Sequence, residues 1–224
     1  MADYKVAETF VSLNGEGLRT GQLAYFVRLA GCNLNCSYCD TAWASNPDEK
    51  FETMTEYEIY EAIRLSGVTN VTVTGGEPLN HPDIAILLEL LLSDELLNIE
   101  IETNGSIDLK PFMNLKNSNR MSYTVDYKLP SSRMEIMMRA ANFDILTEND
   151  TVKFVASDMN DLERAKTVID AYDLTKKCHV LISPVYGEIT PLEIADFIKE
   201  KTLNEVGLQI QLHKLLWGEE TRGV

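Results

Sequence analysis

The sequence predicts an α/β fold, a partial (incomplete) TIM-like barrel of about six parallel βα units with an N-terminal hairpin extension. Short runs rich in β-formers alternate with segments that carry helix start signals, which is typical of parallel strands joined by right-handed crossovers. The chain has 224 residues, fewer than the about 250 that a closed eight-fold barrel usually needs. Because no linker, repeat or low-complexity tract divides the sequence, we expect one domain over residues 1–224.

The expected strands follow the hairpin in a regular order. Residues 1–24 form the expected hairpin extension, and residues 32–51 are expected to be a long loop. The predicted strands of the parallel sheet are Tyr25–Leu29, Val71–Thr74, Ile99–Thr103, Tyr123–Asp126, Val152–Val155, His179–Ser183 and Leu208–Leu212.

The expected helices are recognised by the residues at which they begin. Thr55 and Glu58 have the spacing of a capping box, in which two side chains satisfy free backbone donors. Asn160 with Glu163 repeats this spacing. The run Thr190-Pro191-Leu192-Glu193 has it as well, and adds a proline at the first helical position. A further helix is expected to open at His81-Pro82.

Polar or unusual residues stand at the carboxyl ends of five expected strands. In parallel sheets the ligand binds at that edge, so five such ends in succession predict one large concave site. These residues are Thr74-Gly75-Gly76-Glu77, Glu102-Thr103-Asn104, Asp126-Tyr127-Lys128, Ser183-Pro184 and His213.

The composition excludes several classes of partner. With 35 acidic and 20 basic residues the net charge is −15, which repels nucleic-acid phosphates and anionic lipids, so we expect neither nucleic acid nor membrane as a partner. The N-terminus lacks the pattern of a secretory signal, and the most apolar run, Ile84–Leu92, is far shorter than the ~20 residues of a membrane span. We therefore expect a cytoplasmic protein with mostly reduced cysteines.

Three of the cysteines lie in one loop. Cys32, Cys36 and Cys39 form a CxxxCxxC pattern, and such soft ligands bind zinc or iron–sulfur clusters. The spacing favours an iron–sulfur cluster. A structural zinc site is the alternative and needs a fourth ligand, which Cys178 or His179 could supply; three unliganded thiols packed as small apolar residues are a third reading. We expect Cys178 in the core, because it precedes a buried strand.

The cysteine loop, the Thr74-Gly75-Gly76-Glu77-Pro78 run and the parallel architecture together resemble the radical S-adenosylmethionine (SAM) superfamily. Taken alone, the Gly-Gly-Glu run would more often be an ordinary strand-to-helix turn. The resemblance implies a [4Fe-4S] cluster held by three cysteines, with the fourth iron open to SAM. It also implies cleavage of SAM to a 5′-deoxyadenosyl radical that abstracts a hydrogen atom, with the protein positioning both cofactors.

Further stretches resemble one family of this superfamily, the 7-carboxy-7-deazaguanine synthases. They are Glu8–Gly17, Tyr25–Leu34, Cys39–Thr41, Ile101–Gly105, Lys128–Ser132 and Gln211–Gly218. The resemblance covers essentially the whole chain, and its first and last stretches discriminate best. It implies a ring-contracting lyase of queuosine biosynthesis that converts 6-carboxy-5,6,7,8-tetrahydropterin to 7-carboxy-7-deazaguanine with loss of ammonia.

The resemblance also implies roles for individual residues. Cys32, Cys36 and Cys39 would bind the cluster, and Thr41 would bind Mg²⁺, although without the family a turn-capping role would be the better reading. The implied SAM-binding residues are Tyr38, Asp40, Gly76, Glu77, Asp126, Tyr127, Lys128 and Ser183. The implied substrate-binding residues are Leu13, Asn14, Gly15, Glu16, Arg28, Thr74, Glu102, His213 and the terminal carboxylate of Val224.

Some residues of the implied site have ordinary alternatives or depart from the family pattern. Arg28 could equally form a salt bridge within a strand, and His213 could be a satisfied strand-end histidine. Asn14 replaces the usual glutamine, and Asp126-Tyr127 replaces the usual Ser-Pro, which bears on the contacts to the SAM ribose.

The resemblance further implies a homodimer and an electron donor such as flavodoxin or ferredoxin. Two other functions remain open at this point. One is a radical SAM activase that places a glycyl radical on a partner enzyme. The other is a zinc or iron–sulfur binding module without SAM chemistry.

Overall fold

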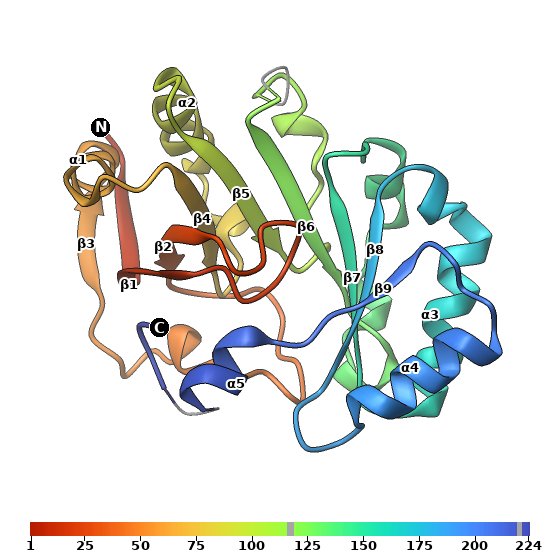
Figure 1. Cartoon of the computed structure of the whole chain (residues 1–224). Coiled ribbons are helices and arrows are strands. Elements are labelled where there is room, and N and C mark those ends of the chain that lie inside the picture. The colour runs from red at the N-terminus through yellow and green to blue at the C-terminus, as the bar shows by residue number, and fades with distance from the viewer. Residues whose placement is uncertain (116–118, 219–220) are drawn as a thin grey trace.

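The structure is a computed structural model, and it describes residues 1–115, 119–218 and 221–224. Within these residues the strands form a single curved sheet in the order β3-β1-β2-β4-β5-β6-β7-β8-β9 (Figure 1). The strands are β1 (Asp3–Leu13), β2 (Leu23–Leu29), β3 (Glu52–Thr55), β4 (Asn70–Gly75), β5 (Asn98–Thr103), β6 (Met121–Tyr127), β7 (Thr151–Ala156), β8 (His179–Pro184) and β9 (Val206–Leu208).

The sheet is an open barrel. All pairs from β2 to β9 are parallel, whereas β1 pairs antiparallel with both β2 and β3. Since the strand order is linear, β3 and β9 form its two edges and the sheet is mostly parallel with an open side. The α/β prediction and the predicted partial barrel are confirmed.

Helices connect part of the parallel strands. They are α1 (Glu56–Ser66), α2 (Ile84–Ser93), α3 (Met159–Tyr172), α4 (Pro191–Glu200) and the short α5 (Leu212–Trp217). The described parts of the β5–β6 and β6–β7 crossovers hold only short 3₁₀ turns, such as Lys110–Phe112 and Pro130–Ser132. Not every crossover is therefore a full βα unit. No helix in the described ranges is both long and apolar enough to cross a membrane.

Two predicted capping boxes are confirmed and one is wrong. The boxes of Thr55 with Glu58 and of Thr190 with Glu193 both form. Helix α3 begins two residues earlier than predicted, because Asp158, not Asn160, is the N-cap, and its carboxylate accepts from the backbone N–H of Asp161 at 2.8 Å. The extended backbone at Asp158 lets its carboxylate reach the first turn, as an N-cap requires.

Two other predicted boundaries differ from the structure, and one strand was not predicted. The hairpin is formed by β1 and β2, so its second arm is itself the first parallel strand. The edge strand β3 begins at Glu52, directly after the expected loop, and pairs with β1. The last strand ends at Leu208, and Leu212 begins α5 rather than ending a strand.

The two faces of the sheet differ in polarity. Side chains alternate along each strand, so one face packs on the helices and the other lines the inside of the barrel. The helix face is apolar and includes Val71, Val73, Ile99, Ile101, Tyr123, Val125, Val152 and Phe154. The inner face carries Thr72, Thr74, Glu100, Glu102, Thr124, Asp126 and Lys153. Because buried polar groups need partners, this inner face indicates a site rather than a core.

Candidate active site

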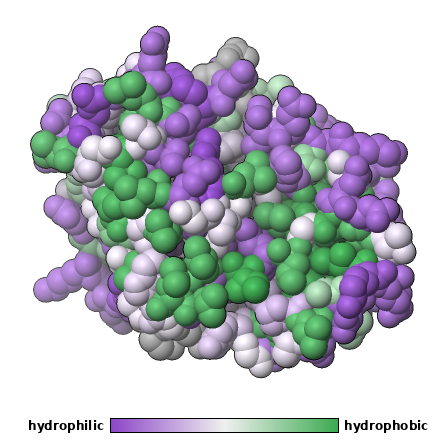
Figure 2. Space-filling model, in the orientation of Figure 1, coloured by the Kyte–Doolittle hydropathy of each residue, from purple (hydrophilic) through white to green (hydrophobic). Residues whose placement is uncertain are grey.

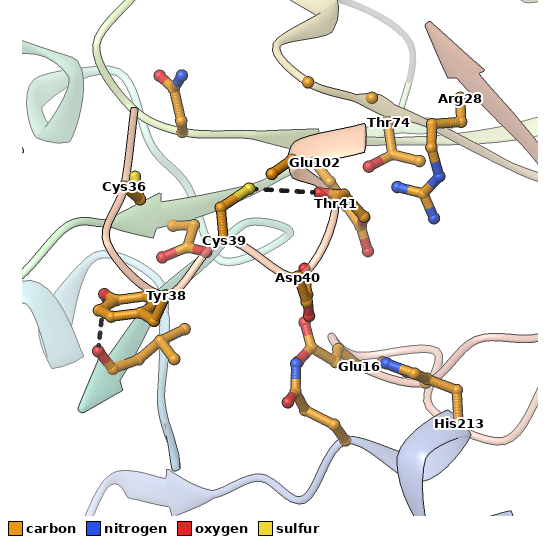
Figure 3. A pocket seen from close by; sticks show the side chains of 18 of the residues that line it. Glu16, Arg28, Cys36, Tyr38, Cys39, Asp40, Thr41, Thr74, Glu102 and His213 are labelled. Atoms are coloured by element: carbon orange, nitrogen blue, oxygen red, sulfur yellow. Dashed lines mark hydrogen bonds between the residues drawn. The ribbon is translucent and has the colours of Figure 1, made fainter. Parts of the chain in front are cut away.

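A cavity of about 810 Å³ opens at the carboxyl ends of the parallel strands, and Figure 3 shows side chains that line it. The predicted site residues that line it are Leu13, Gly15, Glu16, Arg28, Cys32, Cys36, Tyr38, Cys39, Asp40, Thr41, Thr74, Gly76, Glu102, Asp126, Lys128, His213 and Val224. The structure thus brings together residues from both termini and from most of the strands between them.

The cysteine loop follows β2 and forms one wall of this cavity. Cys32 and Cys36 are partly buried, while Cys39 is exposed. The backbone N–H of Leu34 and the side-chain amide of Asn104 donate to Cys32 Sγ at 3.4 and 3.6 Å. Burial raises the pKa of Cys36 to about 11, so this thiol is protonated near neutral pH in the absence of a metal.

The Gly-Gly-Glu turn packs directly on the start of the cysteine loop. The backbone N–H of Gly76 donates to Leu29 O at 3.1 Å, and that of Glu77 donates to Gly31 O at 2.8 Å. A Cβ atom at Gly76 would lie 2.0 Å from Gly31 O and 2.9 Å from Cys32 Cβ. Only glycine therefore permits this close approach of the turn to the cysteine loop.

The Glu77 carboxylate lies behind the cavity wall rather than on it. It accepts from the backbone N–H groups of Leu79 and Asn104 at 3.0 and 2.6 Å and from Thr103 Oγ1 at 2.9 Å. Burial nevertheless raises the pKa of Glu77 to about 7. In this arrangement the carboxylate joins the ends of β4 and β5, and a contact with the SAM ammonium stays a prediction.

A row of alternating charges crosses the floor of the cavity. Lys128 Nζ lies 2.8 Å from Asp126 Oδ2, Lys153 Nζ lies 3.6 Å from the same oxygen, and Lys153 also donates to Glu16 Oε2. Burial alone would favour neutral side chains, but the two lysines keep the pKa of Asp126 below its ordinary value. Sequence reasoning missed Lys153, although its place in an expected strand between Val152 and Phe154 indicates an inner-face position.

Two further groups in the cavity have shifted pKa values. Burial, together with the nearby charge of Glu16, raises the pKa of Glu102. Burial lowers the pKa of His213, although Glu16 and Asp40 oppose this effect. These opposite shifts bring the pKa values of a carboxyl and an imidazole closer together, which favours proton transfer between groups of these two kinds.

Arg28, Thr74 and Thr41 also line the cavity (Figure 3). Arg28 Nε donates to Glu8 Oε1 at 2.9 Å, so the salt bridge that the sequence allowed is formed while the residue still lines the cavity. Thr41 Oγ1 lies 3.8 Å from Cys39 Sγ. The Thr41 side chain does not cap the 3₁₀ turn that follows it, which leaves its hydroxyl oriented for another role.

The C-terminal segment folds across the mouth of the cavity. Leu212 donates its backbone N–H to Gly15 O at 3.1 Å, and Lys214 Nζ lies 3.0 Å from Asp40 Oδ2. Burial alone would raise the pKa of Asp40, but the charge of Lys214 outweighs this effect and holds that pKa below its ordinary value. The Arg222 guanidinium stacks on Trp43 at 4.0 Å from the ring centre, which brings the last residues onto the cysteine loop.

Besides Glu77, three predicted site residues do not line the cavity. Tyr127 points to the helix face of β6 and packs against Phe143 and Phe154, because neighbouring side chains of a strand alternate. Its side chain therefore lies away from the cavity, and its part in SAM binding stays a prediction. Asn14 is buried and accepts from Thr72 Oγ1 at 2.9 Å. Ser183 is fully buried, and its hydroxyl has no hydrogen-bond partner among the described residues.

The structure places both candidates for the fourth ligand of a structural zinc site, Cys178 and His179, away from the cysteine loop. Cys178 and His179 stand at the amino end of β8, whereas the cysteine loop follows the carboxyl end of the parallel strand β2. Cys178 is buried, as predicted, and its thiol contacts Leu174 O at 3.6 Å. In the described parts of the chain, no group of three or more His, Cys, Asp or Glu side chains forms a ready-made metal site.

Comparisons with known proteins first define the class of enzyme. Residues 27–149 match the family model of the radical SAM superfamily, so the open parallel barrel and its three-cysteine loop are those of a radical SAM enzyme. The solved structure of QueE from Escherichia coli has the same fold, with a TM-score of 0.71 over 94% of this chain and 95% of that one at 23% identity. SuiB from Streptococcus suis, bound to its precursor peptide, aligns with a TM-score of 0.59 over 80% of this chain and 46% of that one, at 14% identity.

The curated relatives then define the family. The 7-carboxy-7-deazaguanine synthase of Clostridium acetobutylicum is 53% identical over 222 residues, which cover 99% of this chain and all of that protein. The proteins of that name from Leptospira interrogans and Methanospirillum hungatei are 34% and 37% identical over 98% and 95% of this chain, and over 97% and 85% of their own lengths. The chain belongs to the 7-carboxy-7-deazaguanine synthase family.

Proposed function

We propose that this chain is a radical SAM lyase that converts 6-carboxy-5,6,7,8-tetrahydropterin to 7-carboxy-7-deazaguanine with loss of ammonia. The observation that carries the proposal is the three-cysteine loop on the wall of a large polar cavity, in a chain that belongs to the family of that name. Family membership over the whole chain favours this lyase over the glycyl-radical activase.

The residues present fit a [4Fe-4S] cluster and SAM. Cys32, Cys36 and Cys39 would hold the cluster, and the donors to Cys32 Sγ favour its thiolate form. When bound, the cluster and SAM supply a 5′-deoxyadenosyl radical that removes a hydrogen atom from the substrate. Thr41 would hold Mg²⁺, a hard ion that takes few protein ligands and completes its shell with water and substrate oxygens.

We assign the side of the cavity nearest the cysteines to SAM. Lys128 and Asp126 present opposite charges there, and the backbone of Gly76 allows close approach of a ligand. Tyr38 donates its hydroxyl to Val155 O at 3.2 Å, which fixes its ring against the site. Asp40, Glu77 and Ser183 complete the proposed set, with Glu77 acting from behind the wall.

We assign the side formed by β1, β2 and α5 to the pterin. Arg28 offers a guanidinium to the substrate carboxylate, and Glu16 offers acceptors to the N–H groups of the ring. Leu13, Asn14, Gly15 and Thr74 would position the ring, and Val224 would approach it from the C-terminal segment. Glu102 and His213 would hold and move protons as ammonia leaves, because their pKa values are shifted in opposite directions.

The chain as a whole would form one radical SAM domain over residues 1–224 and act as a homodimer. Figure 2 shows apolar side chains gathered over α5, where Leu215, Leu216 and Trp217 are exposed. An exposed apolar group of this kind supports the proposed dimer. An electron donor such as flavodoxin or ferredoxin would reduce the cluster.

Anaerobic reconstitution with iron and sulfide, followed by incubation with the carboxy-tetrahydropterin, SAM, a reductant and Mg²⁺, tests the proposal. We expect 7-carboxy-7-deazaguanine by mass spectrometry in wild type, and neither product nor SAM cleavage in Cys36→Ala. Cys178→Ala is the matched control, because it removes a thiol at the amino ends of the parallel strands, away from the cysteine loop, and should retain the cluster. A competent wild-type cluster that cleaves SAM but gives no deazapurine would refute the proposed substrate.

A further inference from the structure

Lys153 occupies the centre of the cavity floor. It lies on the inner face of β7, directly opposite Asp126 in the strand register, and is only 8% exposed. Its ammonium donates to Glu16 Oε2 and lies 3.6 Å from Asp126 Oδ2. Glu16 belongs to the loop after β1, so this lysine joins two parts of the chain that are 137 residues apart.

Each of the two carboxylates uses only one of its oxygens in these contacts. Glu16 Oε1 and Asp126 Oδ1 are buried and have no hydrogen-bond partner among the described residues. A buried acceptor without a partner is costly, and such atoms at the wall of a cavity indicate that a ligand supplies the missing donors. Because an ionised carboxylate only accepts hydrogen bonds, the ligand groups must be N–H or O–H donors.

We propose that Lys153 is a positioning residue that pairs with Glu16 and Asp126 and orients them, so that their free oxygens accept from two different ligands. Glu16 follows β1, on the side assigned to the pterin, and its Oε1 would take an N–H edge of an aminopyrimidinone ring. Asp126 pairs with Lys128 on the side assigned to SAM, and its Oδ1 would take a ribose hydroxyl. The identity of the two ligands rests on the proposed function, whereas the charge-holding role of Lys153 does not.

The charges around Lys153 explain why one cation is needed at this position. Burial disfavours the charged lysine, but the surrounding carboxylates outweigh this effect and raise its pKa. The titratable groups that influence it or are influenced by it are Glu16, Asp40, Glu100, Glu102, Asp126, Lys128 and His213. Without Lys153, Asp126 would keep Lys128 at 2.8 Å, whereas Glu16 would lose the one ion pair that the described residues give it.

Lys153→Met in the reconstituted holoenzyme tests this role. We expect KM for the pterin to rise at least about tenfold, and the dissociation constant of SAM to rise less, because Lys128 still compensates Asp126. The variant should also show a steeper pH dependence of ligand affinity than wild type. Lys153 lowers the pKa values of Asp126 and Glu102, so without it these pKa values rise and ligand affinity should improve more strongly as the pH is raised from about 6 to 9.

Matched variants separate this role from a structural one. Lys153→Arg retains the charge and should keep the wild-type pH profile, and Lys199→Met removes an exposed lysine of α4 and should change neither constant. If Lys153→Met does not retain its cluster, the double variant Lys153→Met/Glu16→Gln removes both charges and should restore cluster content while leaving the pterin KM high. A double variant that regains neither cluster nor fold would contradict the proposal.

The outcomes also distinguish this inference from the proposed function. If wild type forms no deazapurine, but Lys153→Met makes SAM affinity more steeply pH-dependent than in wild type, the substrate assignment fails and the role of Lys153 stands. If wild type turns over and Lys153→Met keeps both constants and their wild-type pH profiles, the role of Lys153 is overturned. Equal losses of affinity for both ligands at every pH would overturn it as well.

Discussion

Gly76 illustrates how a single residue determines the geometry of the site. Its backbone N–H and that of Glu77 donate to Leu29 O and Gly31 O, which joins the turn after β4 to the start of the cysteine loop. The nearest atoms to a hypothetical Cβ belong to the Gly31 carbonyl, at 2.0 and 2.4 Å, and backbone atoms cannot rotate away. A side chain at position 76 would therefore push the turn away from the cysteine loop.

We predict that Gly76→Ala separates the turn from the cysteine loop. Overpacking of this kind costs about 1–3 kcal/mol, and the reconstituted protein should hold markedly less iron than wild type. Denaturant unfolding and iron content measure the two effects. Gly21→Ala is the control: it meets no atom within 4 Å and costs only the strain of its φ of +80°, so its iron content should equal that of wild type. Normal iron content in Gly76→Ala would contradict this account.

At the scale of elements, the capping-box spacing predicted the start of a helix correctly where its first residue is the N-cap. Thr55 and Thr190 each had a glutamate three residues on, and both boxes form. At α3 the same spacing from Asn160 was misleading, because β7 ends at Ala156 and the chain turns into the helix at once. The cap is Asp158, two residues after the strand ends.

We predict that Asp158→Ala lowers the free energy of unfolding by about 1 kcal/mol, the usual cost of losing an N-cap. Asn160→Ala should change it by a few tenths of a kcal/mol at most, since this exposed residue lies within the helix and caps nothing. Urea unfolding followed by circular dichroism compares the two variants directly. Equal effects of the two substitutions, or a larger effect at Asn160, would be inconsistent with the N-cap assigned here.

Long-range pairing explains most of what sequence reasoning could not predict. The edge strand β3 has four residues and exists because β1 extends beside it, which no local pattern near Glu52 reveals. Likewise, the short 3₁₀ turns between β5 and β7 replace helices that a regular βα repeat would have. Turn and cap chemistry is local and can be predicted, whereas strand partners depend on the whole sheet.

At the scale of the whole molecule, the position of the site was predictable but its charge network was not. The five polar groups that the sequence places at strand ends imply a shared mouth, and the cavity at that edge includes residues from four of them. Three lie at strand ends, through Thr74, Glu102 and Asp126, whereas His213 reaches the cavity from α5. The contact between Glu16 and Lys153 joins two ends of the barrel that meet only because the sheet curves. Such pairs need three-dimensional information, even though alternation already placed Lys153 on the inner face.

The open barrel also leaves carboxyl groups inside the molecule, and these should govern how its stability depends on pH. Glu100 lies one layer below Glu102 on β5 and is 4% exposed. It accepts from Thr124 Oγ1 at 2.6 Å, and its other oxygen is 3.9 Å from Arg19. Burial, with a smaller contribution from Glu102, raises the pKa of Glu100 from 4.5 to about 7. A carboxyl with a raised pKa holds its proton in the folded state at a pH where the unfolded chain has released it.

It follows that the free energy of unfolding should decrease as the pH rises from about 4.5 to about 7, because the folded state binds more protons in that window. We predict that Glu100→Gln removes this loss. Relative to wild type, the variant should gain on the order of 2 kcal/mol between pH 5 and pH 8, while its amide oxygen still accepts from Thr124. Urea unfolding at both pH values measures the difference, and Glu148→Gln on an exposed turn is the control. A constant difference between wild type and Glu100→Gln at the two pH values would show that the ionisation of Glu100 does not oppose folding.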